Sequence, residues 1–542
     1  MALPERRITL AVGVSILGGI ALFVGLAAYA LLTVDIGGSS DRVIFDAYVW
    51  RVTRFTLLQA LLSTALSILF AIPLALALFR QSTFPGRIWI VRLLALPLGL
   101  PALVAALGLI GVWGRQGVVN SLLADIGLAQ PLSIYGLAGI LIAHVFFNLP
   151  LAARLMLAGL ERLPGEYWLI GVNLGMRRFH LFRFIEWPVI RGLIPGIAGL
   201  IFMLCATSFT LVLTLGGGPA ASTIEVAIYQ ALRFDFDPPR VIALSLLQIA
   251  MTGLLLVIAR LLTPRVAESV TLGRSARRFD GRDVAGRLVD GFGIAICTGF
   301  VALPLAAVVV SGLQSDLLRL ATDPVVQRAV VTSTTIALAS ALLCVAGTLS
   351  MVFARQTALR PRRPGRGARS LAAGIAGGSS LILLVPPVVL GAGWFLLLRP
   401  FGDVARFAPL IVIVINALMA LPFAYRILDP AISSHRARTE VLSESLGLQF
   451  FNRLHLVDWP GLRRPILMAL SFACALSLGD LGAVALFGSQ DMVTLPYLLY
   501  SRMGSYRTMD AAGLALLLGF VCLILTIAGT PVEGQSERVD DR

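Results

Sequence analysis

One pattern occurs twice in this sequence, and every matched residue of the second copy lies 272 positions after its counterpart in the first. The match runs without a gap from a Leu-Pro pair, through a Leu-Gly pair, to an acidic residue followed by Trp-Pro. The matched segments are Leu149-Pro150, Leu174-Gly175 and Glu186-Trp187-Pro188 in the first copy, and Leu421-Pro422, Leu446-Gly447 and Asp458-Trp459-Pro460 in the second. Such a gap-free internal repeat predicts that the chain consists of two copies of one structural unit.

The composition places both copies in a membrane. Of the 542 residues, 58% are hydrophobic and only 13% are charged, and the mean hydropathy is +0.89. A soluble protein of this size needs more charge to cover its surface. The sequence therefore predicts a polytopic membrane protein, for which we expect membrane lipid as a partner and no nucleic acid.

Twelve apolar runs are long enough to cross the membrane, which takes about 20 helical residues. We therefore expect an all-α fold with about twelve transmembrane helices, six in each copy. The expected organisation is a first half at 1–263, a cytoplasmic linker at 264–287, a second half at 288–530 and a cytoplasmic tail at 531–542. The twelve runs are 8–34, 56–79, 88–113, 134–160, 189–214, 240–263, 288–312, 329–354, 370–398, 408–429, 465–488 and 511–530.

Arginine sets the expected orientation, because all 44 basic residues are Arg and the sequence has no Lys. The segments 80–87, 264–287 and 355–369 and both repeat loops are rich in Arg, whereas the alternate segments 35–50 and 114–133 are poor in it. Segments rich in positive charge stay on the cytoplasmic side of the membrane. We therefore expect both termini, both repeat loops and the linker to be cytoplasmic.

The residue types also exclude several classes of function. A P-loop needs a Lys to reach the nucleotide phosphates, so a chain without Lys lacks a standard nucleotide-hydrolysing site. The five cysteines lie in apolar runs, and the four histidines show no zinc-type spacing with them. We therefore expect no enzymatic activity, no metal and no cofactor in this chain.

The repeated loop resembles the conserved cytoplasmic loop of ATP-binding-cassette importer permeases. In that family a Glu-Ala-Ala triplet is followed by a Gly and later by a Leu-Pro pair, and the loop contributes a short helix that docks on a separate ATPase subunit. Gly175 and Gly447 match the family Gly, and Pro188 and Pro460 match the closing Pro. Other residues replace the Glu-Ala-Ala triplet in both copies.

Further segments resemble the fused two-half permeases of bacterial thiamine importers along nearly the whole chain. This resemblance implies two tandem six-helix units of the type I importer class in the inner membrane, two copies of a cytoplasmic ATPase that uses the ATP, and a periplasmic binding protein that delivers thiamine or its phosphate esters. Ferric-iron importer permeases share the two-half layout and are the nearest alternative. The resemblance rests on Tyr135-Gly136, Ala143–Pro150, Leu215–Pro219, Thr223–Gln230, Leu478-Gly479-Asp480 and Leu486-Phe487-Gly488.

The resemblance assigns the ATPase-docking surface to residues of the two loops. In the first loop Arg alternates with aromatic residues, which is typical of a segment that lies at the level of the lipid headgroups. A membrane-surface helix without a partner has the same pattern, but it does not explain a second copy in the same register. The expected docking residues are Leu174, Gly175, Arg177, Arg178, Glu186, Trp187 and Pro188, and Leu446, Gly447, Asp458, Trp459 and Pro460.

Three polar residues inside predicted spans are candidates for the translocation path. Asp480 is a carboxylate within an apolar run, aligned with Ser208, and charges inside a membrane are costly enough to indicate a function. Thiamine carries a fixed cationic thiazolium, so Asp480 is a candidate to line its path; a helix–helix hydrogen bond or ion pair is the alternative. His144 is the third candidate, for which a hydrogen bond to a neighbouring carbonyl is the simpler interpretation.

A secondary transporter is the remaining alternative, because such carriers are also built from repeats. An ion-coupled carrier is expected to show several carboxylates along one path through the membrane. This sequence has one prominent intramembrane carboxylate and two copies of a docking loop, so it favours the importer permease.

Overall fold

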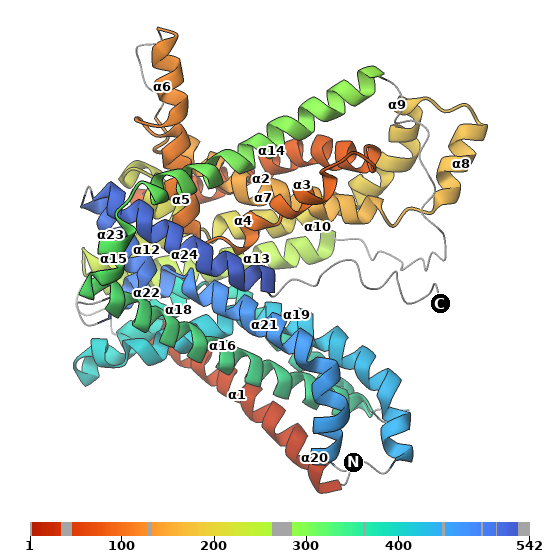
Figure 1. Cartoon of the computed structure of the whole chain (residues 1–542). Helices are drawn as coiled ribbons and strands as arrows, with labels where there is room; N and C mark the ends of the chain where they lie inside the picture. Colours follow the sequence, from red (N-terminus) through yellow and green to blue (C-terminus); the bar gives the residue numbers. More distant parts are fainter. Residues whose placement is uncertain are drawn as a thin grey trace. The chain divides into compact units, whose positions relative to one another are not determined.

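The computed structural model describes residues 3–33, 46–127, 133–262, 284–360, 365–446, 450–488, 492–505 and 507–528. Every regular element in these ranges is a helix (Figure 1), which confirms the prediction of an all-α fold. Gly447, most of the predicted linker and the predicted tail at 531–542 lie outside the described residues.

The helical elements follow the two copies of the sequence. The first copy contains α1 (Leu3–Thr33), α2 (Ala47–Arg80), α3 (Arg87–Leu93), α4 (Leu96–Gly99), α5 (Ala102–Trp113), α6 (Val118–Asp125), α7 (Leu137–Leu160), α8 (Gly165–Asn173), α9 (Arg178–Leu181), η1 (Phe182–Glu186), α10 (Trp187–Ala206), α11 (Thr210–Leu215), η2 (Pro219–Ala221), α12 (Ile224–Arg233) and α13 (Pro238–Leu262). The second contains α14 (Val284–Leu313), α15 (Leu317–Thr322), α16 (Pro324–Leu359), α17 (Arg366–Leu381), η4 (Ile382–Leu384), α18 (Pro387–Leu398), η5 (Arg399–Phe401), η6 (Val404–Arg406), α19 (Ala408–Ser445), α20 (Phe450–Arg453), η7 (Leu454–Asp458), α21 (Trp459–Leu478), α22 (Gly482–Phe487), α23 (Leu495–Gly504) and α24 (Thr508–Ala528).

The number of membrane-crossing helices agrees with the sequence. Within the described ranges, 11 helices are long and apolar enough to cross a membrane, and Pro387–Phe401 is a shorter apolar helix. Each of the twelve predicted runs overlaps one of these. The chain is therefore a multi-pass membrane protein.

Proline interrupts two of the predicted runs. Pro101 precedes α5 and Pro386 precedes α18, and both prolines have extended ψ values, of 135° and 152°. Proline has no backbone N–H, and it disfavours the helical conformation of the residue before it. The runs 88–113 and 370–398 therefore each end in a short 12-residue helix that starts directly after the break. Pro150 and Pro422, by contrast, stay inside α7 and α19.

The sequence repeat is also a repeat of structural elements. The elements α9, η1, α10 and α11 begin and end 272 residues before α20, η7, α21 and α22 respectively. In each copy, a buried hydroxyl also accepts a hydrogen bond from the first residue of a later helix. Thr56 Oγ1 accepts from Ile224 N of α12 at 3.0 Å, and Ser333 Oγ accepts from Leu495 N of α23 at 2.7 Å.

The chain folds into two compact units that exchange the first helices of the two copies. One unit comprises 43–227 and 246–315, and thus contains α14 together with α2, α5, α7 and α10. The other comprises 1–42, 228–245 and 316–542, in which α1 packs against α16 and α18. The predicted halves, with boundaries at 263 and 288, describe the sequence copies and stay predictions.

Small residues allow the exchanged helices to approach their neighbours closely, as is common between membrane helices. A Cβ atom on Gly393 of α18 would lie 2.6 Å from the carbonyl oxygen of Ala27 in α1, so only Gly fits there. Trp394 Nε1 also donates a hydrogen bond to the Phe23 carbonyl, at 3.2 Å. In the other unit, a Cβ on Gly108 of α5 would lie 2.4 Å from the Pro304 carbonyl oxygen of α14.

Candidate functional site

The first repeat loop is a series of short helices between α7 and α10. Pro164 separates α7 from α8, because it cannot donate the backbone hydrogen bond that would continue the helix. The second loop aligns Arg436 with this proline, and there α19 continues as one helix to Ser445. The two loops therefore share their second part but differ in how the chain enters them.

Gly175 ends α8 by a backbone motif that favours glycine. Its φ is +60°, and Met176 N donates to the Gly171 carbonyl at 2.9 Å while Leu174 N donates to that of Ile170 at 3.0 Å. A hydrogen bond spanning five residues next to a left-handed glycine is the usual way to close a helix C-terminus. Other residues in this conformation are destabilised by about 1–2 kcal/mol. The glycine of the motif is thus explained by the turn itself.

Both loops contain one turn of π-helix directly before Trp-Pro. The elements η1 and η7 end at Glu186 and Asp458, and the next residues, Trp187 and Trp459, begin the long helices α10 and α21. Proline inside a helix clashes with the carbonyl four residues earlier, and a wider turn relieves such crowding. Pro188 and Pro460 therefore have a local structural effect in both copies.

Several of the expected docking residues are exposed in both loops. Leu174 is 66% exposed and its counterpart Leu446 is 64% exposed. Trp187 and Trp459 are 36% and 50% exposed. Exposed apolar side chains of this size are typical of a surface that binds a partner or a membrane.

The acidic residue before Trp-Pro is turned inward in both loops. Glu186 is fully buried and receives two hydrogen bonds from Arg80, the last residue of α2: Nη2 to Oε2 at 2.5 Å and Nε to Oε1 at 3.3 Å. In the second loop Asp458 lies 3.1 Å from His435 Nε2 and 3.3 Å from Arg453 Nε. The structure therefore places these two acids where they hold the loops, rather than on the exposed surface.

The two arginines of the first loop differ in their surroundings. Arg177 is exposed, whereas Arg178 forms an ion pair with Asp290 of α14. Asp290 is 5% exposed and also accepts a hydrogen bond from Gln81 Nε2 at 3.2 Å. Sequence reasoning missed Arg80 and Asp290, although Asp290 gave the same signal as Asp480, an acid inside an apolar run.

Asp480 and Ser208 lie in equivalent helix breaks. Asp480 follows the end of α21 and precedes α22, and Ser208 lies between α10 and α11, so neither is in the middle of a helix as expected. Asp480 Oδ1 accepts a hydrogen bond from Gly482 N at 3.0 Å, and its buried Oδ2 has no hydrogen-bond partner among the described residues. Both candidates thus lie just before the start of a short helix, α11 or α22, each within its own unit.

His144 is buried in α7, with a side chain that is 2% exposed. Its Nδ1 lies 2.9 Å from Ser63 Oγ in α2, so the partner is a hydroxyl rather than the expected carbonyl. Its Nε2 is buried and has no hydrogen-bond partner in the part of the chain that the structure describes. Its role on a translocation path stays a prediction.

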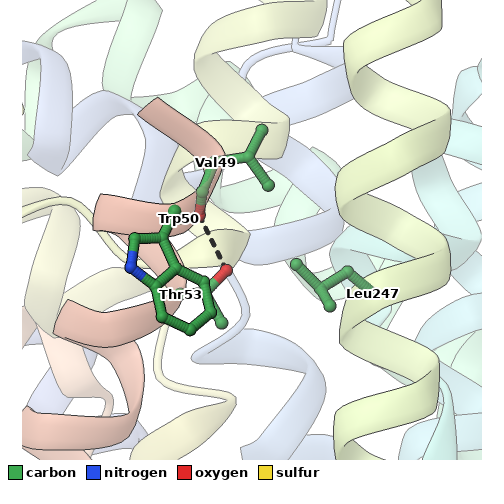
Figure 2. Close-up of a pocket in the computed structure, with 4 residues that line it drawn as sticks. All are labelled: Val49, Trp50, Thr53 and Leu247. Atoms are coloured by element: carbon green, nitrogen blue, oxygen red, sulfur yellow. Dashed lines mark hydrogen bonds between the residues drawn. The ribbon is translucent and has the colours of Figure 1, made fainter. Parts of the chain in front are cut away.

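A pocket of about 310 Å³ lies at the end of α2 that is farther from the first loop. Figure 2 shows its lining of Val49, Trp50, Thr53 and Leu247. The Thr53 hydroxyl already donates to the Val49 carbonyl at 2.7 Å, so the lining is essentially apolar. This surface suits a lipid chain better than a charged substrate.

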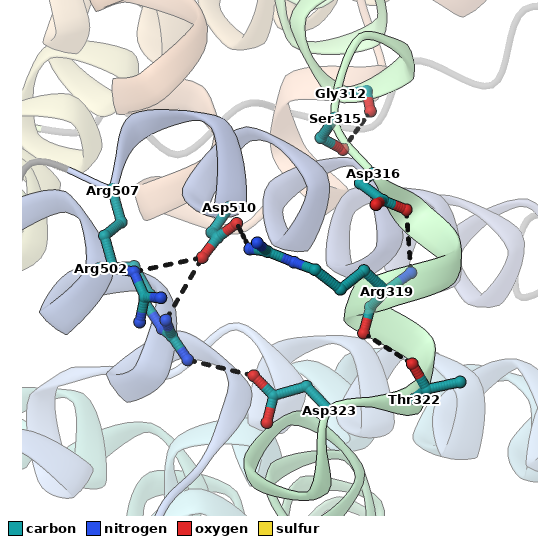
Figure 3. Close-up of polar contacts among 9 residues, drawn as sticks. All are labelled: Gly312, Ser315, Asp316, Arg319, Thr322, Asp323, Arg502, Arg507 and Asp510. Atoms are coloured by element: carbon teal, nitrogen blue, oxygen red, sulfur yellow. Dashed lines mark hydrogen bonds and ion pairs between the residues drawn. The ribbon is translucent and has the colours of Figure 1, made fainter.

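An ion-pair cluster joins four helices in the other unit, at the end of α16 farther from the second loop (Figure 3). Arg502 of α23 lies 3.3 Å from both Asp323, before α16, and Asp510 of α24. Asp510 is also 2.6 Å from Arg319 of α15. The cluster has partners for its charges within itself and stabilises this end of the unit.

Comparison with known proteins shows similarity along nearly the whole chain. No protein-family model matches. The thiamine transport system permease protein ThiP of Brucella abortus (strain 2308) is 51% identical over 532 residues, which are 97% of this chain and 96% of that protein. ThiP of Escherichia coli (strain K12) is 44% identical over 496 residues, 91% of each chain.

A more distant relative matches only part of the chain. The sulfate transport system permease protein CysT of Salmonella typhimurium is 30% identical over 216 residues, which are 40% of this chain and 76% of that protein. Similarity to a shorter permease over less than half of the residues agrees with a chain built from two copies. Together with the identity to ThiP over almost the full length, it shows that this chain belongs to the family of thiamine transport system permease proteins.

Proposed function

We propose that this chain is the membrane-spanning permease subunit of an ATP-binding-cassette importer that translocates thiamine or its phosphate esters. The observation that carries the proposal is the 51% identity to a thiamine permease over 97% of this chain. The duplicated loops with exposed apolar residues support it, because an importer of this kind needs a docking surface for each of two ATPase subunits.

The partners in this proposal are a cytoplasmic ATPase in two copies and a periplasmic binding protein that delivers the substrate. ATP is used by the ATPase subunit, and this chain, which has no Lys for a P-loop, hydrolyses no nucleotide. Arg-rich loops support an inner-membrane orientation with both termini in the cytoplasm. Membrane lipid surrounds the exposed apolar helix faces, and the chain has no function with nucleic acid.

Each loop would bind its ATPase subunit through the exposed leucine and tryptophan. Leu174 and Trp187 in the first loop, and Leu446 and Trp459 in the second, provide apolar contacts that become buried on docking. Such buried side chains at the centre of an interface contribute most of its binding energy. Arg177 and Pro188 of the first loop are exposed as well.

Co-purification tests the docking surface. In the variant Leu174→Asp/Leu446→Asp, we expect binding of the ATPase subunit to weaken by about 2 kcal/mol or more, roughly 30-fold in affinity, because a charge replaces a buried apolar contact. The matched control is Leu318→Asp, at an exposed leucine in α15. This short helix directly precedes α16, at the end of α16 that is farther from the second loop. An ATPase subunit that co-purifies equally with all three proteins contradicts the docking proposal.

Uptake tests the substrate. Cells that lack this chain are expected to lose accumulation of labelled thiamine and to regain it when the chain is restored. Uptake of labelled thiamine pyrophosphate, measured in the same cells, distinguishes transport of the free vitamin from transport of its esters. Restored uptake of ferric iron without uptake of thiamine contradicts the proposed substrate.

A further inference from the structure

The first loop is tied to the rest of its unit by a network of four charged residues. Arg80 holds Glu186 with two hydrogen bonds, and Arg178 pairs with Asp290. Arg80 Nη1 also lies 4.0 Å from Asp290 Oδ1. The two arginines balance the two carboxylates, so the network is neutral as a whole.

The carboxylates of this network are shielded from water. Glu186 is fully buried and Asp290 is 5% exposed, while Arg80 and Arg178 are 11% and 30% exposed. Removing one partner of a buried ion pair leaves the other charge uncompensated, which is much more costly than losing a surface pair. The network therefore holds the loop firmly against the helices that supply its partners.

Those helices come from both copies of the sequence. Arg80 ends α2 of the first copy, whereas Asp290 is the seventh residue of α14, the first helix of the second copy. A displacement of the first loop thus acts directly on α14 through Arg178 and Asp290. In α14, Asp290 is followed by Gly291 and Gly293. Each glycine destabilises a helix by about 0.5–1 kcal/mol relative to Ala, so α14 bends more easily there.

The second loop is held by different partners. Asp458 pairs with His435 of α19 and with Arg453 of the loop itself, and Arg360 after α16 pairs with Glu440 at 2.9 Å. The position aligned with Arg178 is Phe450, which has no charge. In α1, which corresponds to α14, the only acidic residue is Glu5 in the first turn. The ion pair from Arg178 to α14 thus uses a charged residue that the second loop does not repeat at the aligned position.

We propose that Asp290 is a positioning residue that transmits the movement of the first ATPase-docking loop to α14, so that the two loops are not equivalent in driving transport. This inference rests on the proposed function, since the movement is the one that an ATPase subunit would impose. Arg178 is the loop residue that makes the link, and Arg80 and Gln81 hold Asp290 in place from α2.

The experiment uses the complete complex of this chain, its ATPase and its binding protein in proteoliposomes. Thiamine uptake and ATP hydrolysis are measured together for Asp290→Asn, Arg178→Gln and the double variant. We expect thiamine transported per ATP to fall about tenfold in each single variant, and ATP hydrolysis to be retained in Asp290→Asn. Because both residues act as one link, the double variant is expected to match the single ones instead of multiplying their losses.

Two further variants separate this role from a folding defect. Arg178→Lys keeps the charge on a half-exposed loop residue and is expected to retain most of the uptake per ATP. The matched control is Arg355→Gln with Asp429→Asn, which removes a pair of 2.7 Å between α16 and α19 and is expected to leave the ratio unchanged. Because the ratio is normalised to ATP, a lower yield of folded protein does not change it.

Unchanged uptake per ATP in Asp290→Asn overturns the inference, as does a double variant whose loss is the product of the single losses. Equal losses in the control pair also overturn it, because the effect would then belong to any ion pair between helices. A wild-type complex that hydrolyses ATP but takes up no thiamine contradicts the proposed function instead.

Discussion

Asp480 places one carboxylate oxygen in a buried position without a hydrogen-bond partner among the described residues. Its other oxygen holds the backbone N–H of Gly482, two residues further on in the same break. This contact is local, so it gives no support to a hydrogen bond between helices. Burying a carboxylate costs free energy unless it is paired with a positive charge, and the thiazolium ring of thiamine carries such a charge.

Replacing the charge tests this residue. Asp480→Asn retains an oxygen that can accept from Gly482 N, and we expect uptake of labelled thiamine to fall about tenfold, or roughly 1.4 kcal/mol, with normal assembly. Asp125→Asn, at the exposed last residue of α6, is the control and is expected to stay within about twofold of wild type. Normal uptake together with reduced assembly in Asp480→Asn would favour a packing role.

Single residues of the first loop show what the sequence can and cannot specify. The Leu-Gly and Trp-Pro motifs marked the segment of short helices between α7 and α10, and the local geometry of Gly175 follows from its type. The burial of Glu186 was not predictable, because it depends on Arg80, which is 106 residues away in the sequence. A local motif contains no information on such a partner.

At the scale of helices, the ends are fixed by specific side chains. The cluster around Arg502 joins the start of α16, the end of α23 and the start of α24 (Figure 3). Arg502 is 11% exposed, so water screens its two ion pairs less than those of the 60% exposed Arg319. Arg502 and Arg319 therefore provide a comparison of a shielded with an exposed pair.

Arg502→Gln is expected to lower the free energy of unfolding by about 1–2 kcal/mol, since it removes charged hydrogen bonds from Asp323 and Asp510. Arg319→Gln is expected to cost less than about 0.5 kcal/mol, as is usual for exposed pairs. Thermal unfolding of the purified chain in detergent checks both values. Equal destabilisation by the two variants would show that burial does not determine the strength of these pairs.

Helix existence was predicted better than helix continuity. Among the described residues, the apolar runs located each helix that is long and apolar enough to cross a membrane, because about 20 apolar residues in sequence are a strong signal. The breaks at Pro101 and Pro386 follow from proline geometry, yet Pro150 and Pro422 remain inside helices. The difference depends on packing around each proline, which the sequence pattern does not show.

At the scale of the whole molecule, the exchange of α1 and α14 between the units was not visible in the sequence. Faces of membrane helices that contact lipid are as apolar as those that contact other helices, so hydrophobic periodicity does not reveal neighbours. The repeat at 272 residues correctly related the four elements α9, η1, α10 and α11 to α20, η7, α21 and α22. The docking and translocation functions of the predicted residues stay predictions.

A divided chain tests the exchange. Pieces 1–272 and 273–542, separated within the predicted linker, are expected to form an active complex when expressed together, because each compact unit contains segments of both. Each piece expressed alone is expected to be degraded, since α1 then lacks α16 and α18. Stable accumulation of either piece alone, measured by membrane fractionation, is the contrary result.

The position of α1 also has a consequence for biosynthesis. The ribosome completes α1 at Thr33, but its neighbour α16 begins only at Pro324. At about 5–20 residues per second, the new helix spends roughly 15–60 s in the membrane before its native neighbour is synthesised. During this interval Gly13 and Ala27, which later fit against other helices, face lipid or the insertion machinery, so the earliest helix of the chain is among the last to reach its final contacts.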